Sequence, residues 1–545
     1  MPSTTLTRPV EVLAPHGDRH DEILTPEALA FLGRLHAAFE DRRRALLTER
    51  RRRALRLASG EPLDFSVATA GIREDPHWRV APPAPGLTDR RVEIFGQPTR
   101  EAAARALASG AQVWMADFED ATSPTWENVI GGQVVLRDLA VYGAELPPNQ
   151  AGLPAYGAGS GDRGDAAAQV PPTTVVRPRG WHLTEEHLRI DGRALSAALV
   201  DFGLYFFHCA QHRIDAGSGP YFYLPKLENH YEARLWNDVF VLAQDLLGIP
   251  RGTVRATVLI ETITAAFEME EILHELREHS AGLNAGRWDY LFSLVKNFAH
   301  RPDYLLPDRS RLTMTAPFMR AYTDLLVRTC HKRGAHALGG LAAQLPASGP
   351  GAEPHAREAA LAAVRLDKER EAEDGFDGSA VVDPALVPTC RAVFDGALAG
   401  RPHQIERTRD DVHITARDLL AVRRTAGPPT EEGIRADIAV ALRYIDAWLR
   451  GSGEVPLEGE AADASTAEIA RCHLWQWLRH GATDPATVHA LLDRECAALA
   501  KEDPGALTLE ARSVLERAAL SRELPAYFTT EAYAEHLVRA TEGAA

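Results

Sequence analysis

Short apolar segments alternate with stretches of helical pattern between residues 88 and 400 of this 545-residue chain. Strands that are each followed by a helix form parallel sheets, because a parallel neighbour can be reached only through a crossover connection. Eight such repeats predict an α/β fold of the (β/α)₈ type, a TIM barrel, with its active site at the carboxyl ends of the strands. The predicted strands are Val92–Phe95, Val113–Ala116, Thr174–Val176, Tyr221–Leu224, Arg255–Ile260, Trp288–Phe292, Leu312–Thr315 and Ala335–Leu338.

A doubly wound parallel sheet is the alternative fold for the same alternation. That fold typically carries a glycine-rich dinucleotide-binding turn after its first strand, and no such turn follows Val92–Phe95. The glycine-rich segment Gly157–Gly164 has neither this spacing nor the Lys-Ser/Thr pair of a phosphate-binding loop. We expect it to be a flexible insertion between the second and third strands.

Helical segments are expected on both sides of the barrel, which is predicted to span residues 88–400. Residues 1–87 are predicted to form an N-terminal helical clasp, whose helix begins at Thr25 and Pro26. Arginines recur in this helix between residues 42 and 53, and we interpret them as a solvated face because acids are interleaved with them. Residues 401–545 are predicted to form a C-terminal α-helical domain in which no strands occur.

Three helix starts are expected in the C-terminal domain. The first lies near Thr430, a capping box at Ser465–Glu468 opens the second, and Asp484 followed by proline opens the third. The acidic stretch Leu457–Asp463 lies directly ahead of the capping box. A loop of this kind forms either a mobile surface or a lid.

Composition restricts the partners of the chain. There are 60 Lys and Arg against 76 Asp and Glu, a net charge of −16, which argues against a nucleic-acid partner. The five cysteines are scattered without a CxxC pair, so neither a disulfide framework nor a zinc ribbon is expected. No signal-peptide core and no apolar run long enough to cross a bilayer are found, so we expect a cytoplasmic protein with no membrane partner.

Ionisable side chains follow most of the predicted strands. Carboxylates gathered at one end of a barrel repel one another and raise one another's pKa unless a cation lies among them. Glu261 and Asp289 are 28 residues apart, about one βα unit, which predicts that both reach the same end of adjacent strands. Oxygen ligands favour Mg²⁺ or Mn²⁺ over zinc, although either acid alone could be only a helix cap or a salt-bridge partner. The full set is Asp117, Glu119, Asp120, Arg177, Arg179, Lys226, Glu228, Glu261 and Asp289.

The stretch from His279 to Phe292 carries the most specific pattern in the chain. It contains the run Gly282-Leu283-Asn284, then Gly286 and Trp288-Asp289-Tyr290-Leu291-Phe292, and it resembles the signature of the malate synthase family, specifically the shorter A-type enzymes. The resemblance extends from about residue 64 to residue 530. Other blocks that resemble this family in the expected order are Met115–Asp120 with Ser123–Trp126, Arg177–Trp181, Thr313–Tyr322 and Gly334–Gly340.

The resemblance implies an acyltransferase of the glyoxylate bypass, which supplies the tricarboxylic acid cycle. An enzyme of this family uses Mg²⁺ to condense acetyl-CoA with glyoxylate and then hydrolyses malyl-CoA to malate and CoA. The resemblance assigns Glu261 and Asp289 as metal ligands and Arg177 as the catalytic arginine. It assigns the base to Asp463, because the run from Asp463 to Glu468 is similar to the corresponding block of the family.

Four further assignments follow from the same resemblance. Asp117 and Glu119 are expected to hold the waters of the metal, and Trp288 is expected beside the substrate. Pro317 matches a position that lines the CoA pocket in the family. Because the base would come from the helical domain and the metal ligands from the barrel, closure of one on the other is expected to assemble the site.

Two other functions fit parts of the pattern. A lyase of the citrate-lyase β-subunit type has similar Pro225–Glu228 and Ile260–Thr262 segments, but such chains are much shorter, and the helical domain that bears Asp463 argues against it. An inactive barrel kept as an interaction scaffold would have lost a metal ligand or the base. The proposed ligands and catalytic residues are all present here, namely Glu261, Asp289, Arg177 and Asp463. No oligomeric state is predicted.

Overall fold

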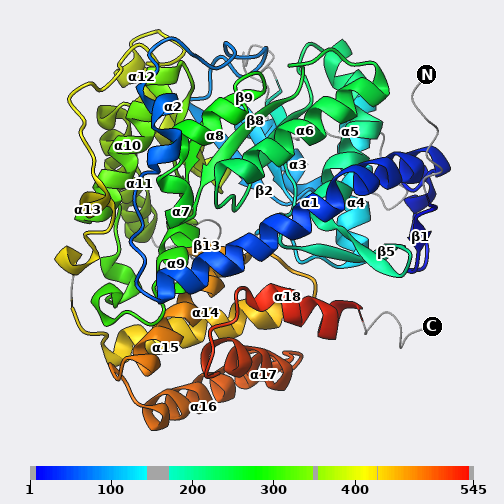
Figure 1. Ribbon diagram of the computed structural model, residues 1–545. Helices are drawn as coiled ribbons and strands as arrows, with labels where there is room; N and C mark the ends of the chain where they lie inside the picture. Colours follow the sequence, from blue (N-terminus) through cyan, green and yellow to red (C-terminus); the bar gives the residue numbers. More distant parts are fainter. Residues whose placement is uncertain (1–7, 144–170, 348–353, 426, 539–545) are drawn as a thin grey trace.

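The structure is a computed structural model that describes residues 8–143, 171–347, 354–425 and 427–538. Segment Gly157–Gly164, expected to be an insertion, lies outside these residues. Figure 1 shows a barrel surrounded by helices, with a long N-terminal helix across its outside and a group of C-terminal helices against one end. The expected (β/α)₈ barrel with flanking helical segments is therefore confirmed.

Eight parallel strands close into the barrel, in the order β10, β11, β2, β3, β4, β7, β8, β9. Their buried side chains alternate between the barrel interior and the surrounding helices, so both faces of the sheet are covered. The strands are β2 (Val92–Gly96), β3 (Val113–Asp117), β4 (Thr173–Arg177), β7 (Tyr221–Leu224), β8 (Arg255–Ile260), β9 (Ser280–Ala285), β10 (Ala337–Ala342) and β11 (Gly378–Val381).

Two predicted strands are wrong. Residues 288–292 lie in helix α9 (Arg287–Asn297), where Tyr290, Leu291, Leu294 and Val295 are buried at helical spacing, and the sixth strand is β9 immediately upstream. Residues 312–315 alternate buried and exposed but have no strand partner, so their strand-like pattern belongs to an irregular segment. The eighth strand, β11, was missed because Gly-Ser-Ala-Val is short and nearly without large apolar side chains.

Helices cover the outside of the barrel between successive strands (Figure 1). A small antiparallel sheet of β1 (Glu11–Val12), β5 (Thr184–Ile190) and β6 (Arg193–Ser196) extends from the β4 connection to the N-terminal segment. The barrel helices are α3 (Arg100–Ser109), α4 (Trp126–Tyr142), α5 (Ala197–Asp215), α6 (His230–Leu247), α7 (Ile263–Ala266), α8 (Met269–Glu275), α9, α10 (Pro317–Arg333), α11 (Pro354–Asp374) and α12 (Val387–Leu398).

The N-terminal helix α1 (Pro26–Ala58) begins as predicted, with Thr25 accepting a hydrogen bond from the backbone of Ala28. It runs obliquely over α5 and α6 (Figure 1), and the short helix α2 (Ala70–Glu74) follows it. The interpretation of its arginines as a solvated face is wrong for several of them. Arg50 is buried and its Nε donates to Glu232 Oε1 at 2.6 Å, so this face carries ion pairs that join α1 to the barrel.

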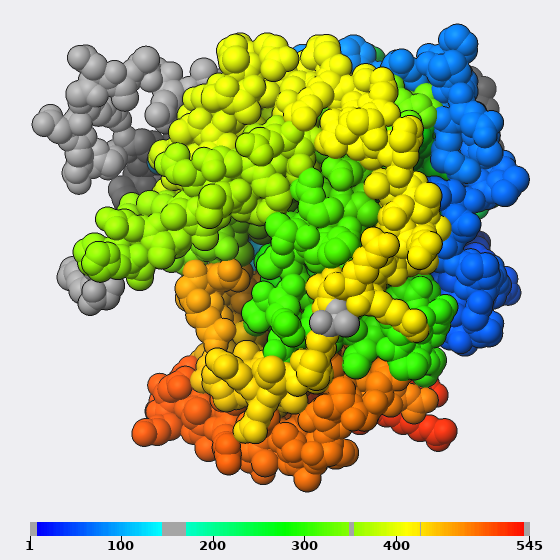
Figure 2. Space-filling model, turned by 90° about the vertical axis from the view of Figure 1, so that its left-hand side faces the viewer, coloured from blue at the N-terminus to red at the C-terminus, as the bar shows by residue number. Residues whose placement is uncertain are grey.

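A second hydrophobic core holds the C-terminal helices together. Figure 2 shows the chain after residue 400 (yellow) descending over the barrel helices to this core (orange and red). No helix of the described residues is long and apolar enough to cross a membrane. The helices are α13 (Ala416–Leu419), α14 (Glu431–Leu449), α15 (Ala464–Arg479), α16 (Pro485–Glu502), α17 (Thr508–Ala519) and α18 (Phe528–Ala532).

The acidic stretch before α15 is a hairpin of β12 (Val455–Leu457) and β13 (Glu460–Ala462), so strands do occur beyond residue 400. Its backbone bonds to the barrel rim, with Ala461 N donating to Ala343 O at 2.7 Å. The predicted capping box is also shifted, because Asp463, and not Ser465, caps α15. A carboxylate accepts N-cap hydrogen bonds as well as a hydroxyl does, and so the sequence pattern allowed both positions.

Candidate active site

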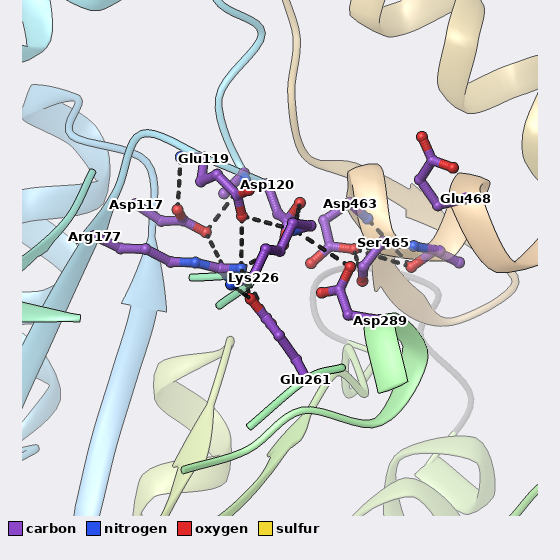
Figure 3. Close-up of polar contacts among 12 residues, drawn as sticks. Asp117, Glu119, Asp120, Arg177, Lys226, Glu261, Asp289, Asp463, Ser465 and Glu468 are labelled. Atoms are coloured by element: carbon purple, nitrogen blue, oxygen red, sulfur yellow. Dashed lines mark hydrogen bonds and ion pairs between the residues drawn. The ribbon is translucent and has the colours of Figure 1, made fainter. Parts of the chain in front are cut away.

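The carboxyl ends of the barrel strands open into a cavity of about 80 Å³ between the barrel and the start of α15. Figure 3 shows acids from several strand ends converging on two cations, with Asp463 facing them from the C-terminal domain. Six of the residues predicted for the site line this cavity together: Asp117, Arg177, Glu261, Trp288, Asp289 and Asp463.

The loop after β3 folds back on Asp117. The side chain of Asp117 accepts hydrogen bonds from the backbone N–H of Glu119 at 2.8 Å and of Ala121 at 3.3 Å. The hydroxyl of Thr122 donates to the carbonyl of Asp117 at 2.6 Å. This turn directs Glu119 and Asp120 toward the strand ends, where both meet the guanidinium of Arg177.

Two buried cations balance part of the acid charge. Arg177, at the end of β4, donates from Nη2 to Glu119 at 2.7 Å and to Asp120 at 2.6 Å, and approaches Glu261 at 3.4 Å. Lys226, after β7, donates from Nζ to Glu119 at 2.7 Å and to Asp120 at 2.9 Å. The Nε of Arg177 has no hydrogen-bond partner among the described residues, so one N–H of this side chain stays available.

Glycine and tyrosine bring Glu261 and Asp289 to the same end of the barrel. A Cβ added at Gly286 would lie 2.8 Å from the Cβ of Glu261, so only glycine allows this approach. The hydroxyl of Tyr322 accepts from Gly286 N at 3.1 Å and donates to the carbonyl of Ile260, which fixes the two strand ends together. Asp289 then reaches the mouth from the first turn of α9 and not from a strand.

Three carboxylates could hold a metal ion. Oxygen atoms of Asp120, Glu261 and Asp289 lie within 4.8 Å of one another, and all three residues are buried. The Oδ1 of Asp289 accepts no hydrogen bond among the described residues, although the Nζ of Lys226 lies 3.2 Å from it as an ion-pair partner. An oxygen-only donor set in which one buried oxygen accepts no hydrogen bond fits a hard divalent cation.

Burial and mutual repulsion disturb the acids of this cluster. Burial and then Asp120 raise the pKa of Asp117 to about 6, in spite of Arg177. Burial and the neighbouring carboxylates raise the pKa of Glu119 and of Asp289 well above their usual range. Burial acts the same way on Asp120, but Lys226 and Arg177 outweigh it and lower the pKa of that carboxyl. When all of them are ionised, the acids carry more negative charge than the two cations compensate, and the raised pKa values reflect this excess.

Asp463 reaches the cavity as the N-cap of α15. Its Oδ1 accepts from Ser465 Oγ at 2.6 Å and from Thr466 N at 3.2 Å, while Oδ2 has no partner among the described residues. The backbone N–H of Ala464 donates to the carbonyl of Asp120 at 3.2 Å, which ties this helix start to the acid cluster. Burial and then Asp120 raise the pKa of Asp463. The group therefore offers one oxygen that can accept a proton.

A second cavity, of about 480 Å³, adjoins the first at Arg287 and Trp288. It lies between the barrel and α14, and Arg309 and Thr313 also line it. The guanidinium of Arg287 lies 3.9 Å from the ring centroid of Trp288, and that of Arg309 lies 5.6 Å from it. Pro317 lines neither cavity and is an exposed residue at the start of α10.

Residues without a predicted role also belong to the site. Asp120 and Lys226 were noted only as ionisable groups at strand ends, yet both make several contacts within the cluster. Glu454, just before the hairpin, lines the cavity with Asp463 and had no sequence signal at all. Glu119 lies outside the main cavity and lines a smaller one beside it, with Lys226 and Tyr527.

Fold and site together define a (β/α)₈-barrel enzyme whose acidic mouth is closed by a C-terminal helical domain. Family models extend the comparison over most of the chain. "Malate synthase, N-terminal domain" matches residues 8–70, "Malate synthase, TIM barrel domain" residues 173–422 and "Malate synthase, C-terminal" residues 428–536. The chain belongs to the malate synthase family, and it is an acyltransferase-type enzyme.

Curated relatives agree over nearly the full length. The malate synthase of Streptomyces clavuligerus is 52% identical over 547 residues, covering 98% of this chain and 99% of the relative. The malate synthase of Myxococcus xanthus (strain DK1622) is 47% identical over 526 residues, covering 94% of both chains. The glyoxysomal malate synthase of Candida tropicalis is 45% identical over 536 residues, covering 96% of this chain and 95% of the relative.

Proposed function

We propose that the chain condenses acetyl-CoA with glyoxylate and hydrolyses the resulting malyl-CoA to malate and CoA. One observation carries the proposal: three groups border one cavity. They are carboxylates suited to a divalent cation, an arginine with an N–H that donates no hydrogen bond among the described residues, and Asp463, whose carboxylate accepts hydrogen bonds from these residues at Oδ1 alone. Each is a part that this reaction needs, namely an electrophile site, an enolate stabiliser and a base.

The metal is proposed to be Mg²⁺, held by Glu261 and Asp289, with Asp120 as a third carboxylate within reach. When bound, Mg²⁺ would supply a Lewis acid that polarises the aldehyde of glyoxylate. Asp117 and Glu119 are proposed to accept hydrogen bonds from waters around the ion. Their carboxylates lie next to the three-acid group, since Arg177 contacts acids of both sets.

Asp463 is proposed as the base that removes a methyl proton from acetyl-CoA. Its Oδ2 is free, and the raised pKa brings the group closer to the acidity range in which a carboxylate both accepts and releases a proton. Ser465 and Thr466 hold the other oxygen, so the free one keeps a fixed direction. The enolate carbon formed in this step would then bond to the aldehyde carbon of glyoxylate.

Arg177 is proposed to stabilise the oxygen of that enolate. Its guanidinium stays protonated, and three neighbouring acids fix its plane. The buried Nε–H without a partner is a donor that an oxygen entering the cavity could satisfy. A donor fixed before charge develops stabilises the transition state without reorganisation.

The second cavity is the proposed site of the CoA portion. It joins the first at Trp288, and two arginines near that ring provide positive charge for phosphate groups in a protein of net charge −16. Trp288→Ala is expected to raise the KM for acetyl-CoA by about tenfold while the affinity for the metal is kept. Pro317 lies outside this cavity, so its proposed contact would be with a part of CoA beyond the cavity, which this variant does not test.

The deciding experiment is a thiol-release assay with acetyl-CoA, glyoxylate and Mg²⁺, in which each component is omitted in turn. We expect release of CoA only when all three are present, with malate as the second product. Removal of the metal with EDTA should stop the reaction, and added Mg²⁺ should restore it. Thiol release from acetyl-CoA alone at the same rate, or cleavage of malyl-CoA without thioester hydrolysis, would contradict the proposal.

A further inference from the structure

Lys226 touches every carboxylate that fits the metal. Its Nζ lies 2.9 Å from Asp120 and 3.2 Å from Asp289, and its backbone N–H donates to Glu261 Oε1 at 2.6 Å (Figure 3). We propose that Lys226 is a fixed internal cation that opposes the divalent metal for these acids, so that tight metal binding depends on the anionic substrate. The inference rests on the proposed function, because it takes the metal and glyoxylate from there.

The backbone of Lys226 is held in place and its side chain is buried against the acids. Lys226 is 3% exposed and adopts a φ of 52°, a left-handed conformation that is unusual for a residue with a side chain. Two contacts hold this backbone: the N–H bond to Glu261, and a 2.9 Å bond from Arg50 Nη2 to the carbonyl of Lys226. A strained conformation persists only where the surroundings determine it, and here they place an ammonium in the mouth.

A metal ion among the three acids would lie a few ångströms from this ammonium. The ligand oxygens lie within 4.8 Å of one another, and Nζ is in contact with two of the three residues. Repulsion between two cations at that distance is strong in a buried site, where water screens poorly. The same contacts partly neutralise Asp120 and Asp289, which weakens their attraction for a second cation.

Glyoxylate carries a negative charge and would restore the balance. A carboxylate that enters with the metal offsets the charge of Lys226 and Arg177, so that metal and substrate favour each other's binding. Such coupling is reciprocal: glyoxylate should tighten the metal by the same factor as the metal tightens glyoxylate. A lysine with a purely structural role would not produce this dependence.

The test is a titration with Mn²⁺, followed by electron paramagnetic resonance at pH 8, with and without glyoxylate. The full-length wild type should bind Mn²⁺ at least tenfold more tightly when glyoxylate is present. K226M should bind Mn²⁺ alone at least tenfold more tightly than the wild type, and the effect of glyoxylate should fall to less than threefold. K226R, which keeps the charge, should restore the coupling.

K296M is the matched control, because Lys296 is another lysine of the site region whose ion pair, at 3.8 Å, is with Glu228 and not with the three-acid group. It should behave as the wild type. If K226M fails to fold, K226Q removes the charge and keeps a hydrogen-bond donor, and it should show the same tightening. Equal or weaker Mn²⁺ binding in a folded K226M or K226Q overturns the inference. A wild type that binds no Mn²⁺ under either condition overturns the proposed function as well.

Discussion

The two ends of the barrel both bury charge, but they treat it differently. Toward the amino ends of the strands, Arg90 donates to Glu93 at 2.7 Å, to Thr257 at 2.9 Å and to Tyr223 at 3.0 Å, and Tyr223 in turn donates to Glu93. All four residues are at most 1% exposed. This floor cluster (Arg90, Glu93, Tyr223 and Thr257) pairs one acid with one base, and its polar groups bond to one another.

The mouth has more acid than base. Arg177 and Lys226 face five carboxylates of the barrel and that of Asp463, and several of the acids have a raised pKa. Unpaired buried charge destabilises a fold, whereas a fully bonded pair is tolerated. The difference separates two uses of buried charge: the floor holds strands together, and the mouth keeps a binding capacity for which the fold gives up stability.

The largest expected effect is that of Asp463→Asn on catalysis. Asparagine caps a helix as well as aspartate does, so α15 should be retained, but the base is lost. We expect kcat to fall by about 10⁴-fold in the thiol-release assay, whereas Mn²⁺ binding and the melting temperature should change little.

Asp484→Asn provides the matched control, since Asp484 caps α16 with the same bond to the backbone three residues on, at 3.0 Å, on the exposed surface. It should leave kcat unchanged. A near-normal rate of condensation in Asp463→Asn would remove Asp463 from the role of base.

In the floor cluster we expect Glu93→Gln to lower stability and to leave catalysis nearly unchanged, the opposite of Asp463→Asn. The change leaves Arg90 buried with a neutral partner, and breaking a buried pair costs about 3 to 5 kcal/mol of unfolding free energy. Urea unfolding measures this loss, while kcat at low temperature should stay within about twofold. In the double variant Arg90→Met with Glu93→Leu, no charge is left unpaired, and stability should partly return. A loss of activity without a loss of stability would show that the floor serves the site directly.

Neutralising one acid of the mouth should raise stability, whereas neutralising the acid of the floor cluster should lower it. Without metal, Asp289→Asn is expected to raise the unfolding free energy by on the order of 1 kcal/mol, because it removes a carboxylate that burial and its neighbours disfavour. The same variant should bind Mn²⁺ at least about 100-fold more weakly. Calorimetry in EDTA and a Mn²⁺ titration measure the two effects, and a lower melting temperature in EDTA would contradict the comparison.

Much of the mouth could be predicted from the sequence, because apolar strands that end in acids repeat along the chain. The sequence shows both the strand and its terminal acid in Val113 to Asp117 and in Arg255 to Glu261. Because the strands are parallel, the two acids could be predicted to lie at the same end of the sheet. The roles of individual acids came from the family resemblance and stay proposals, as does the cytoplasmic location. So do the domain limits at residues 87 and 400.

Contacts between distant segments could not be predicted. Lys226 meets Asp120 across 106 residues, and only the closed barrel brings the two together. The strand pattern also failed where small residues form a strand, as in Gly378–Val381, or where alternation occurs without a partner, as in residues 312–315. In both cases contacts with distant parts of the chain determine the conformation, and such contacts cannot be predicted from a local sequence pattern.

The smallest expected effect concerns pH and a single acid of the mouth. Burial and then the charge of Asp463 raise the pKa of Glu454 from 4.5 to about 7. The folded protein therefore binds this proton more tightly than the unfolded chain, and stability falls as the pH rises between these two values. Glu454→Gln should melt at a higher temperature than the wild type at pH 8 and at the same temperature at pH 4. Glu458→Gln, in the exposed turn of the same hairpin, should follow the wild type at both. If the wild type melted at a higher temperature than Glu454→Gln at pH 8, the ionised carboxylate of Glu454 would be stabilised by a partner, as that of Glu93 is. The mouth would then contain one unpaired charge fewer.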